Sequence, residues 1–146
     1  MTAASSGPRS RARELIVQAL YQMQIAHHDK QELLAQFHER PDYQRVDQPF
    51  FDESLSGILD ARSSLEERAG EFLDRPLSQL DPVERGVLLL GLFELQTRAE
   101  IPYRVVINEA VNLTKRFGSV DGHKYVNAVL DRAAGRMRQG ESRTTR

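Results

Sequence analysis

The chain has 146 residues, enough for one domain with its own core, and its 40% hydrophobic and 28% charged residues are typical of a soluble protein. It has no cysteine, which excludes disulfides, thiolate zinc sites and cysteine nucleophiles. No apolar run is long enough to span a membrane, and the first residues, MTAASSGP, have no apolar signal core, so we expect a cytoplasmic protein.

The net charge of −1 hides a separation of charge along the chain. Residues 1–30 carry four basic and two acidic side chains, residues 31–100 seven and fifteen, and residues 101–146 nine and four. Basic ends around an acidic middle predict a basic surface formed by the two ends of the chain. Basic tails that are merely solvated are the alternative explanation.

Helical periodicity runs through nearly the whole chain, and the first helix is expected from about Arg9 to His27. Its apolar residues form one stripe, made of Leu15, Ile16, Ala19, Leu20, Met23 and Ala26. Asp29 and Glu32 form a capping-box pattern that begins a short second helix. Residues 40–49, RPDYQRVDQP, are expected to form a loop, and a long helix is expected from about Gln48 to Leu73.

The clearest local signal is LDPVERGVLLLGLFELQ, residues 80–96. Asp81 is expected at the N-cap of this helix, with Glu84 completing a capping box. The residues that follow are apolar on nearly every side, which predicts a central helix surrounded by others. Gly86 and Gly91 would let neighbouring helices approach closely.

After the turn AEIPYR, an amphipathic helix is expected to end at Gly118, and the last helix is expected to begin near Asp121. The prediction is one compact all-α domain of about six or seven helices over residues 9–138. Residues 1–8 and 139–146 are expected to be disordered tails.

The start of the first helix carries Arg9, Arg11 and Arg13. This is a poor place for cations, because the positive end of the helix dipole costs each of them roughly 0.3–1 kcal/mol. Gln18 and Tyr21 fall on the face opposite the apolar stripe. Arginines that meet phosphates and a ring that stacks on an unpaired base predict an RNA-binding face. The alternative is that a neighbouring helix covers Tyr21.

A second candidate for RNA binding is FGSVDGHKYVNAVLD, residues 117–131, where a glycine-bracketed loop leads into a helix start. His123, Lys124 and Asn127 supply donors for phosphate, sugar and base edges, and Tyr125 supplies a ring for stacking. A helix cap followed by solvated polar residues is the alternative.

Nothing in the sequence indicates catalysis, and we expect neither an enzyme nor a cofactor. The chain has no glycine-rich phosphate loop, nucleophile elbow or His-Glu-x-x-His motif. His27, His28 and His38 suggest a metal site at first sight, but adjacent histidines diverge on a helix, which favours a helix-end cluster.

Three stretches resemble the NusB family of bacterial transcription antitermination factors: RARELIVQALYQMQ, LDPVERGVLLLGLFEL and IPYRVVINEAVNLTKRFGSVDGHKYVNAVLDR. The resemblance extends from about Arg9 to Arg138 and implies two packed three-helix bundles with an additional helix. It also implies binding to the boxA element of ribosomal RNA leader transcripts, together with the ribosomal protein NusE. The pair would join an antitermination complex on RNA polymerase.

Carried over to this chain, the resemblance implies an RNA-binding surface made of Arg9, Arg11, Arg13, Gln18, Tyr21, Asp121, His123, Lys124, Tyr125 and Asn127. It implies a surface for the protein partner with Glu84, Tyr103 and Arg104. For two of these residues the alternative to partner binding is a structural role, in which Glu84 caps a helix and Tyr103 packs against the turn. Gly122 stands where other members often carry serine.

Two other functions stay open. NusB-like domains also serve ribosomal RNA methyltransferases as RNA-recognition domains, although this chain has neither a glycine-rich cofactor loop nor a cysteine nucleophile. The other alternative is a helical adaptor that binds only proteins. The chain is expected to be a monomer or a homodimer, and a dimer would cover the arginine face through exposed groups such as Ile25.

Overall fold

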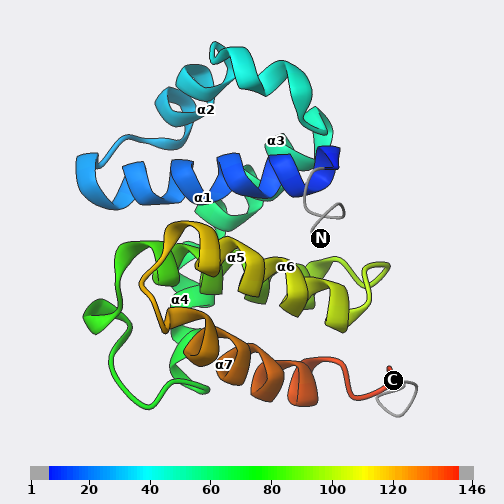
Figure 1. Cartoon of the computed structure of the whole chain (residues 1–146). Coiled ribbons are helices and arrows are strands. Elements are labelled where there is room, and N and C mark those ends of the chain that lie inside the picture. Colours follow the sequence, from blue (N-terminus) through cyan, green and yellow to red (C-terminus); the bar gives the residue numbers. More distant parts are fainter. Residues whose placement is uncertain (1–6, 142–146) are drawn as a thin grey trace.

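Seven α-helices and two short 3₁₀-helices make up the computed structural model, which describes residues 7–141 and has no strand among them. The first layer, uppermost in Figure 1, holds α1 (Pro8–Ala26), α2 (Lys30–His38), the 3₁₀-helix η2 (Pro41–Arg45) and α3 (Gln48–Asp60). The second holds α4 (Arg62–Gly70), the 3₁₀-helix η3 (Leu77–Gln79), α5 (Pro82–Thr97), α6 (Tyr103–Phe117) and α7 (Gly122–Met137). The all-α prediction is confirmed. The two layers correspond to the two three-helix bundles, and α4 is the additional helix.

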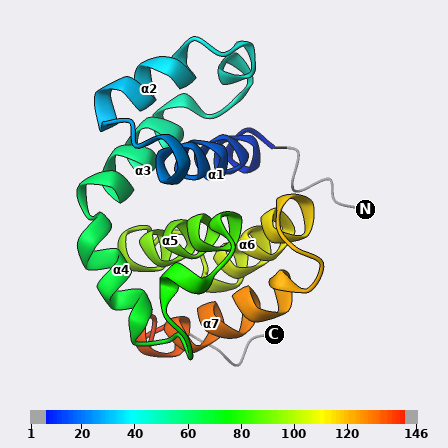
Figure 2. The same cartoon turned by 90° about the vertical axis from the view of Figure 1, so that its left-hand side faces the viewer.

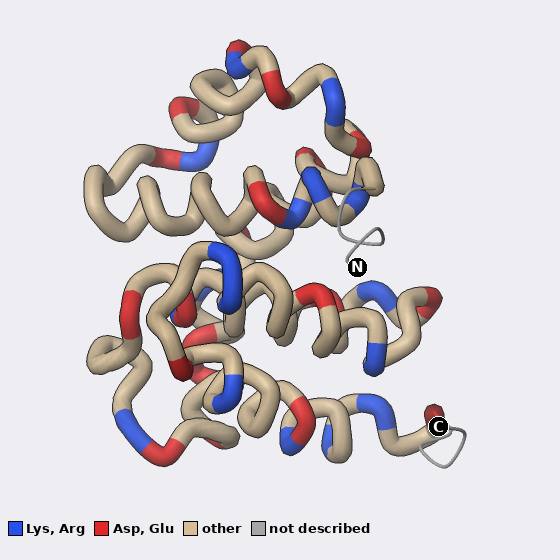
Figure 3. Tube along the Cα trace, viewed as in Figure 1, with Lys and Arg blue, Asp and Glu red and all other residues tan. Residues whose placement is uncertain are grey.

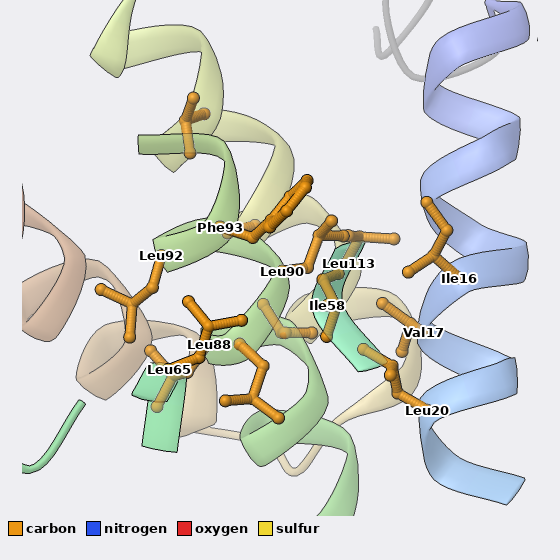
Figure 4. Close-up of a cluster of buried hydrophobic side chains, with 14 of the residues drawn as sticks. Ile16, Val17, Leu20, Ile58, Leu65, Leu88, Leu90, Leu92, Phe93 and Leu113 are labelled. Atoms are coloured by element: carbon orange, nitrogen blue, oxygen red, sulfur yellow. The ribbon is translucent and has the colours of Figure 1, made fainter. Parts of the chain in front are cut away.

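α5 lies at the centre of the fold, as its apolar sequence predicts. Every residue from Gly86 to Leu95 is buried, because α1 and α3 pack on one side of α5 and α4, α6 and α7 on the others. In Figure 4, side chains of α5 meet Ile16 of α1 and Ile58 of α3 across the boundary between the layers. A Cβ atom at Gly91 would lie 2.8 Å from Cδ1 of Leu130, so this glycine allows the close approach of α7.

The prediction of one long helix from Gln48 to Leu73 is wrong, because the helix is interrupted at Ala61 and forms α3 and α4 instead. α3 packs against α1 in the first layer and α4 against α5 in the second, so the chain bends between the layers (Figure 2). The hydroxyl of Ser64 donates a hydrogen bond to the carbonyl of Ala61 at 3.0 Å, next to the bend. The loop expected at residues 40–49 also contains η2.

Two of the three capping interactions predicted from the sequence are confirmed. The capping box of Asp29 and Glu32 is formed in both directions, and it begins α2. Asp81 caps α5 by accepting a hydrogen bond from the backbone N–H of Val83 at 2.7 Å. The box predicted for Glu84 is wrong, because its carboxylate accepts a hydrogen bond from the hydroxyl of Ser119.

Residues just after α7 are held against the rest of the fold as far as Glu141. The guanidinium of Arg138 donates hydrogen bonds to four backbone carbonyls, those of Glu94, Leu95, Arg98 and Ile101. It also pairs with the carboxylate of Glu141 at 2.6 Å, and Glu141 accepts a hydrogen bond from the backbone N–H of Tyr103. Arg138 therefore closes the C-terminal end of α5. Residues 1–6 and 142–146, where we predicted most of the disorder, lie outside the described residues.

We predict that Arg138→Ala lowers the free energy of unfolding by about 2–4 kcal/mol, because it leaves buried carbonyls without donors. Urea unfolding followed by circular dichroism measures this change. Arg136→Ala on the same helix is the control and should cost less than about 0.5 kcal/mol, because this side chain is exposed and its contact with Glu71 is 3.8 Å long. Equal effects of the two substitutions would contradict the capping role.

Candidate nucleic-acid interface

The three arginines at the start of α1 point in different directions, because successive residues of a helix are turned by about 100°. Arg9 is exposed, and its Nε atom lies 3.5 Å from Oδ2 of Asp47. Arg11 is also exposed and lines a groove between α1, η2 and α6. Arg13 is buried. Two of the three are therefore available to a ligand.

Arg13, which we predicted to contact phosphate, faces the interior, and its side chain is only 5% exposed. Its guanidinium forms two hydrogen bonds with the carboxylate of Glu94 on α5, with Nε–Oε2 2.8 Å and Nη2–Oε1 3.0 Å. The Nη1 atom lies 3.6 Å from Oε1 of Glu109 on α6, which also accepts from the hydroxyl of Ser10. α1 packs against α3 within the first layer and against α5 of the second layer, so it is buried on two sides, whereas the sequence suggested a single apolar stripe.

Tyr21 lies on the open face of α1, and the alternative in which a neighbouring helix covers it is wrong. The residue is 45% exposed and lines a hollow of about 720 Å³ together with Gln18 of the same helix. Phe37 of the first layer and Phe117 at the end of α6 in the second also line the hollow. A ring at the edge of such a hollow can stack on a planar group from solvent.

At the start of α7, three of the predicted residues are exposed. They are Asp121, Lys124 and Asn127, and the first two form an ion pair at 3.6 Å. His123 is half-buried, and its Nδ1 atom has no hydrogen-bond partner among the described residues. This helix start therefore presents one cation and one amide to solvent.

Tyr125, the fifth predicted residue here, is held by the segment that follows α4. Its hydroxyl donates a hydrogen bond to Oδ1 of Asp74 at 2.9 Å, and the guanidinium carbon of Arg75 lies 4.4 Å from the centre of its ring. Hydrogen bonds from Arg75 and Tyr125 hold the pKa of the Asp74 carboxyl below its usual value. Burial and the bond to Asp74 raise the pKa of the Tyr125 hydroxyl. Arg75 thus occupies one face of the ring that we predicted as a stacking platform.

The end of α6 connects the two predicted parts of the surface. Arg116, near the end of α6, forms an ion pair with Glu14 of α1 at 3.3 Å, and the next residue, Phe117, lines the hollow beside Tyr21. Sequence reasoning placed neither Arg116 nor Arg45 of η2 in the site, although both line the same groove as Arg11.

Two of the three residues predicted for the protein partner are buried. Glu84 is 7% exposed and accepts a hydrogen bond from the hydroxyl of Ser119, and Tyr103 is 1% exposed. A Cβ atom at Gly122 would lie 1.9 Å from Oε2 of Glu84, so the glycine at this position lets the loop close over the carboxylate. Of the three residues predicted for the protein partner, Glu84 and Tyr103 are therefore buried and Arg104 lies on the surface.

The predicted histidine cluster takes part in local structure. His27 ends α1 in the left-handed conformation, with φ 59° and ψ 40°, and His38 lies 2.8 Å from Asp52. Within residues 7–141, no three His, Asp or Glu side chains are grouped so that they could hold a metal ion. None of the helices in that range is long and apolar enough to cross a membrane.

The sequence profile of the NusB family matches residues 10–135, and the chain belongs to this family. The transcription antitermination protein NusB of Pseudomonas entomophila (strain L48) is 47% identical over 141 residues, which cover 97% of this chain and 85% of that protein. The protein of the same name from Stenotrophomonas maltophilia (strain R551-3) is 48% identical over 134 residues, covering 92% and 84% of the two chains.

A solved structure of T. maritima NusB has the same fold. It superposes with a TM-score of 0.80 at 29% sequence identity, over 89% of this chain and 92% of that one. The family resemblance carried by the three sequence stretches is therefore confirmed by sequence and by structure.

The position of Arg13 gives a prediction on stability. Arg13→Ala should lower the free energy of unfolding by about 3–5 kcal/mol, because it leaves the buried carboxylate of Glu94 without a partner. Arg11→Ala should change it by less than about 0.5 kcal/mol, because that side chain is exposed. Urea denaturation measures both changes.

A double substitution separates loss of the charge pair from loss of packing. Replacing Arg13 by Met and Glu94 by Leu together should recover much of the lost stability, because neither charge is then buried alone. If Arg13→Ala and Arg11→Ala were equally mild, Arg13 would not be the interior residue described above.

Proposed function

We propose that this protein is a transcription antitermination factor that binds the boxA element of ribosomal RNA leader transcripts together with the ribosomal protein NusE. In this proposal the pair joins the antitermination complex on RNA polymerase. Membership of the NusB family and the names of the relatives support the general function. The RNA contact is supported by the chemistry of the exposed face of α1.

The observation that carries the proposal is the position of Tyr21 beside a basic groove. Gln18 lines both the hollow that holds Tyr21 and the groove that holds Arg11, so the two are adjacent along α1. A single RNA strand needs both elements, because cations bind its phosphates and aromatic rings stack on its bases. Arg13 takes no part in this contact.

The start of α7 supplies the second part of the proposed RNA surface. Lys124 and Asn127 are exposed there, so a cation is available for phosphate and an amide for base edges or the 2′-hydroxyl. Asp121 pairs with Lys124, and His123 and Tyr125 are half-buried beside them. These three residues are proposed to shape the contact more than to bind phosphate directly.

For NusE, the charge distribution supports the proposal. Residues 31–100 carry fifteen acidic and seven basic side chains, which suits a basic ribosomal protein. Of the residues predicted for this contact, we retain only Arg104, which is exposed at the start of α6. Glu84 is proposed to act indirectly, by holding Ser119 and the loop before α7 in place.

A helical adaptor that binds only proteins is the second candidate. The exposed apolar side chain of Ile25 beside the hollow favours it, since an apolar surface of this kind can also bind a protein. The two functions differ in their dependence on RNA sequence and on salt.

We predict that the protein binds a fluorescently labelled boxA-like RNA more tightly than a scrambled RNA, that NusE tightens this binding, and that salt weakens it. Fluorescence anisotropy measures all three effects. Tyr21→Ala should weaken binding by about 5- to 150-fold, which corresponds to the roughly 1–3 kcal/mol of one stacked base. Tyr21→Phe should bind almost as the wild type does.

Arg11→Ala and Lys124→Ala should weaken binding to both RNAs and reduce the salt dependence of the affinity. Equal affinity of the wild-type protein for the boxA-like and the scrambled RNA would contradict sequence-selective binding. The absence of RNA binding, with binding of NusE retained, would favour the adaptor.

A further inference from the structure

The groove beside Arg11 contains two further arginines from distant parts of the chain. It has a volume of about 260 Å³ and is lined by Arg11 of α1, Arg45 of η2 and Arg116 of α6, with Leu15 and Val46 as apolar lining residues. Figure 3 shows basic residues both at the start of α1 and at the end of α6, the two helices that border the groove. Three arginines that are distant in the sequence therefore line one groove in the folded chain.

The two carboxylates of the groove are already paired with arginines. Asp42 accepts two hydrogen bonds from Arg40, at 3.1 and 3.0 Å, and Glu14 pairs with Arg116 at 3.3 Å. No carboxylate among residues 7–141 forms an ion pair with Arg11 or Arg45. Because guanidinium groups stay protonated in proteins, the groove holds two uncompensated cations and is suited to an anion.

The groove lies next to the hollow around Tyr21. Gln18 lines both, and it follows Arg11 by two turns of α1, about 10.5 Å along the helix axis. An extended anionic chain lying along α1 can therefore place charges between the arginines and a planar group on Tyr21. A strand of RNA has this combination of charge and planar groups, whereas an acidic peptide has no base to stack.

We infer that Arg45 and Arg116, together with Arg11, form a phosphate-binding groove for the RNA strand whose base stacks on Tyr21. This inference rests on the proposed function and adds two residues to it. Phosphate contacts hold the strand in position and carry no sequence information, so the groove sets affinity while other residues select the sequence. Glu14 opposes binding, because its carboxylate neutralises Arg116 and repels phosphate.

The test is fluorescence anisotropy with the full chain and the boxA-like RNA at several salt concentrations. Arg45→Ala and Arg116→Ala should each weaken binding by about 3- to 10-fold near 0.1 M salt. Each should reduce the slope of log affinity against log salt by about 0.7. The ratio of affinities for the boxA-like and scrambled RNAs should stay unchanged.

Arg136→Ala is the matched control, because it removes the same charge from a side chain of almost the same exposure. The side chain of Arg136 is 63% exposed and that of Arg116 is 64%, and each pairs with one glutamate. The control should bind as the wild type does. Circular dichroism spectra and urea midpoints of all variants confirm that they are folded.

Glu14→Gln should change the RNA affinity in the opposite direction, and an increase in affinity cannot result from unfolding. It should tighten RNA binding by about 2- to 5-fold, because Arg116 is then released to bind phosphate. If the wild-type protein binds the RNA while Arg45→Ala and Arg116→Ala match the Arg136→Ala control, the inference fails and the proposed function stands. If the wild type binds no RNA, both fail. Binding of a poly-glutamate peptide in the groove with no RNA binding would assign it to an acidic protein segment instead.

Discussion

The buried contact of Arg13 with Glu94 and Glu109 is the constraint on which the arrangement of this protein depends. It joins α1 of the first layer to α5 and α6 of the second, at distances of 2.8 to 3.6 Å. A charge in this position tolerates little displacement, because an unpaired guanidinium or carboxylate in the interior costs several kcal/mol, about 3–5 when one partner is lost. The contact therefore fixes both the spacing of the two layers and the rotation of α1.

The rotation of α1 decides which side chains meet solvent. Arg11 is two residues from Arg13 and is turned by about 200°, so it faces outward when Arg13 faces inward. Gln18 lies about 20° from Arg11 around the helix, and it lines both the arginine groove and the hollow around Tyr21. The interior ion pair of Arg13 and Glu94 thus determines which side chains of α1 lie on the exposed surface. Arg13 lies unfavourably near the positive end of the helix dipole, and this cost is offset by its ion pair with Glu94 in the interior. In our proposal, RNA phosphate offsets the same cost for Arg11 at the surface.

Local signals in the sequence predicted much of the fold, because they depend on neighbouring residues. The capping box at Asp29 and the all-apolar character of α5 are examples. The break at Ala61 had no such signal, since neither proline nor glycine marks it and only the packing of two layers requires it. Of the candidate site, the exposure of Tyr21 followed from helical periodicity. The burial of Arg13 and Glu84 and the approach of Arg45 and Arg116 to α1 depend on contacts between distant segments, which periodicity does not contain.

The central claim is that an RNA strand lies along the outer face of α1, from the arginine groove to Tyr21. Photocrosslinking of a boxA-like RNA that carries 4-thiouridine at successive positions, followed by mass spectrometry of the peptides, tests it most directly. We expect crosslinks to the part of α1 that contains Tyr21, and to the end of α6 from a neighbouring position of the RNA. Crosslinks confined to α2, α3 and α4, with none on α1, would contradict this account.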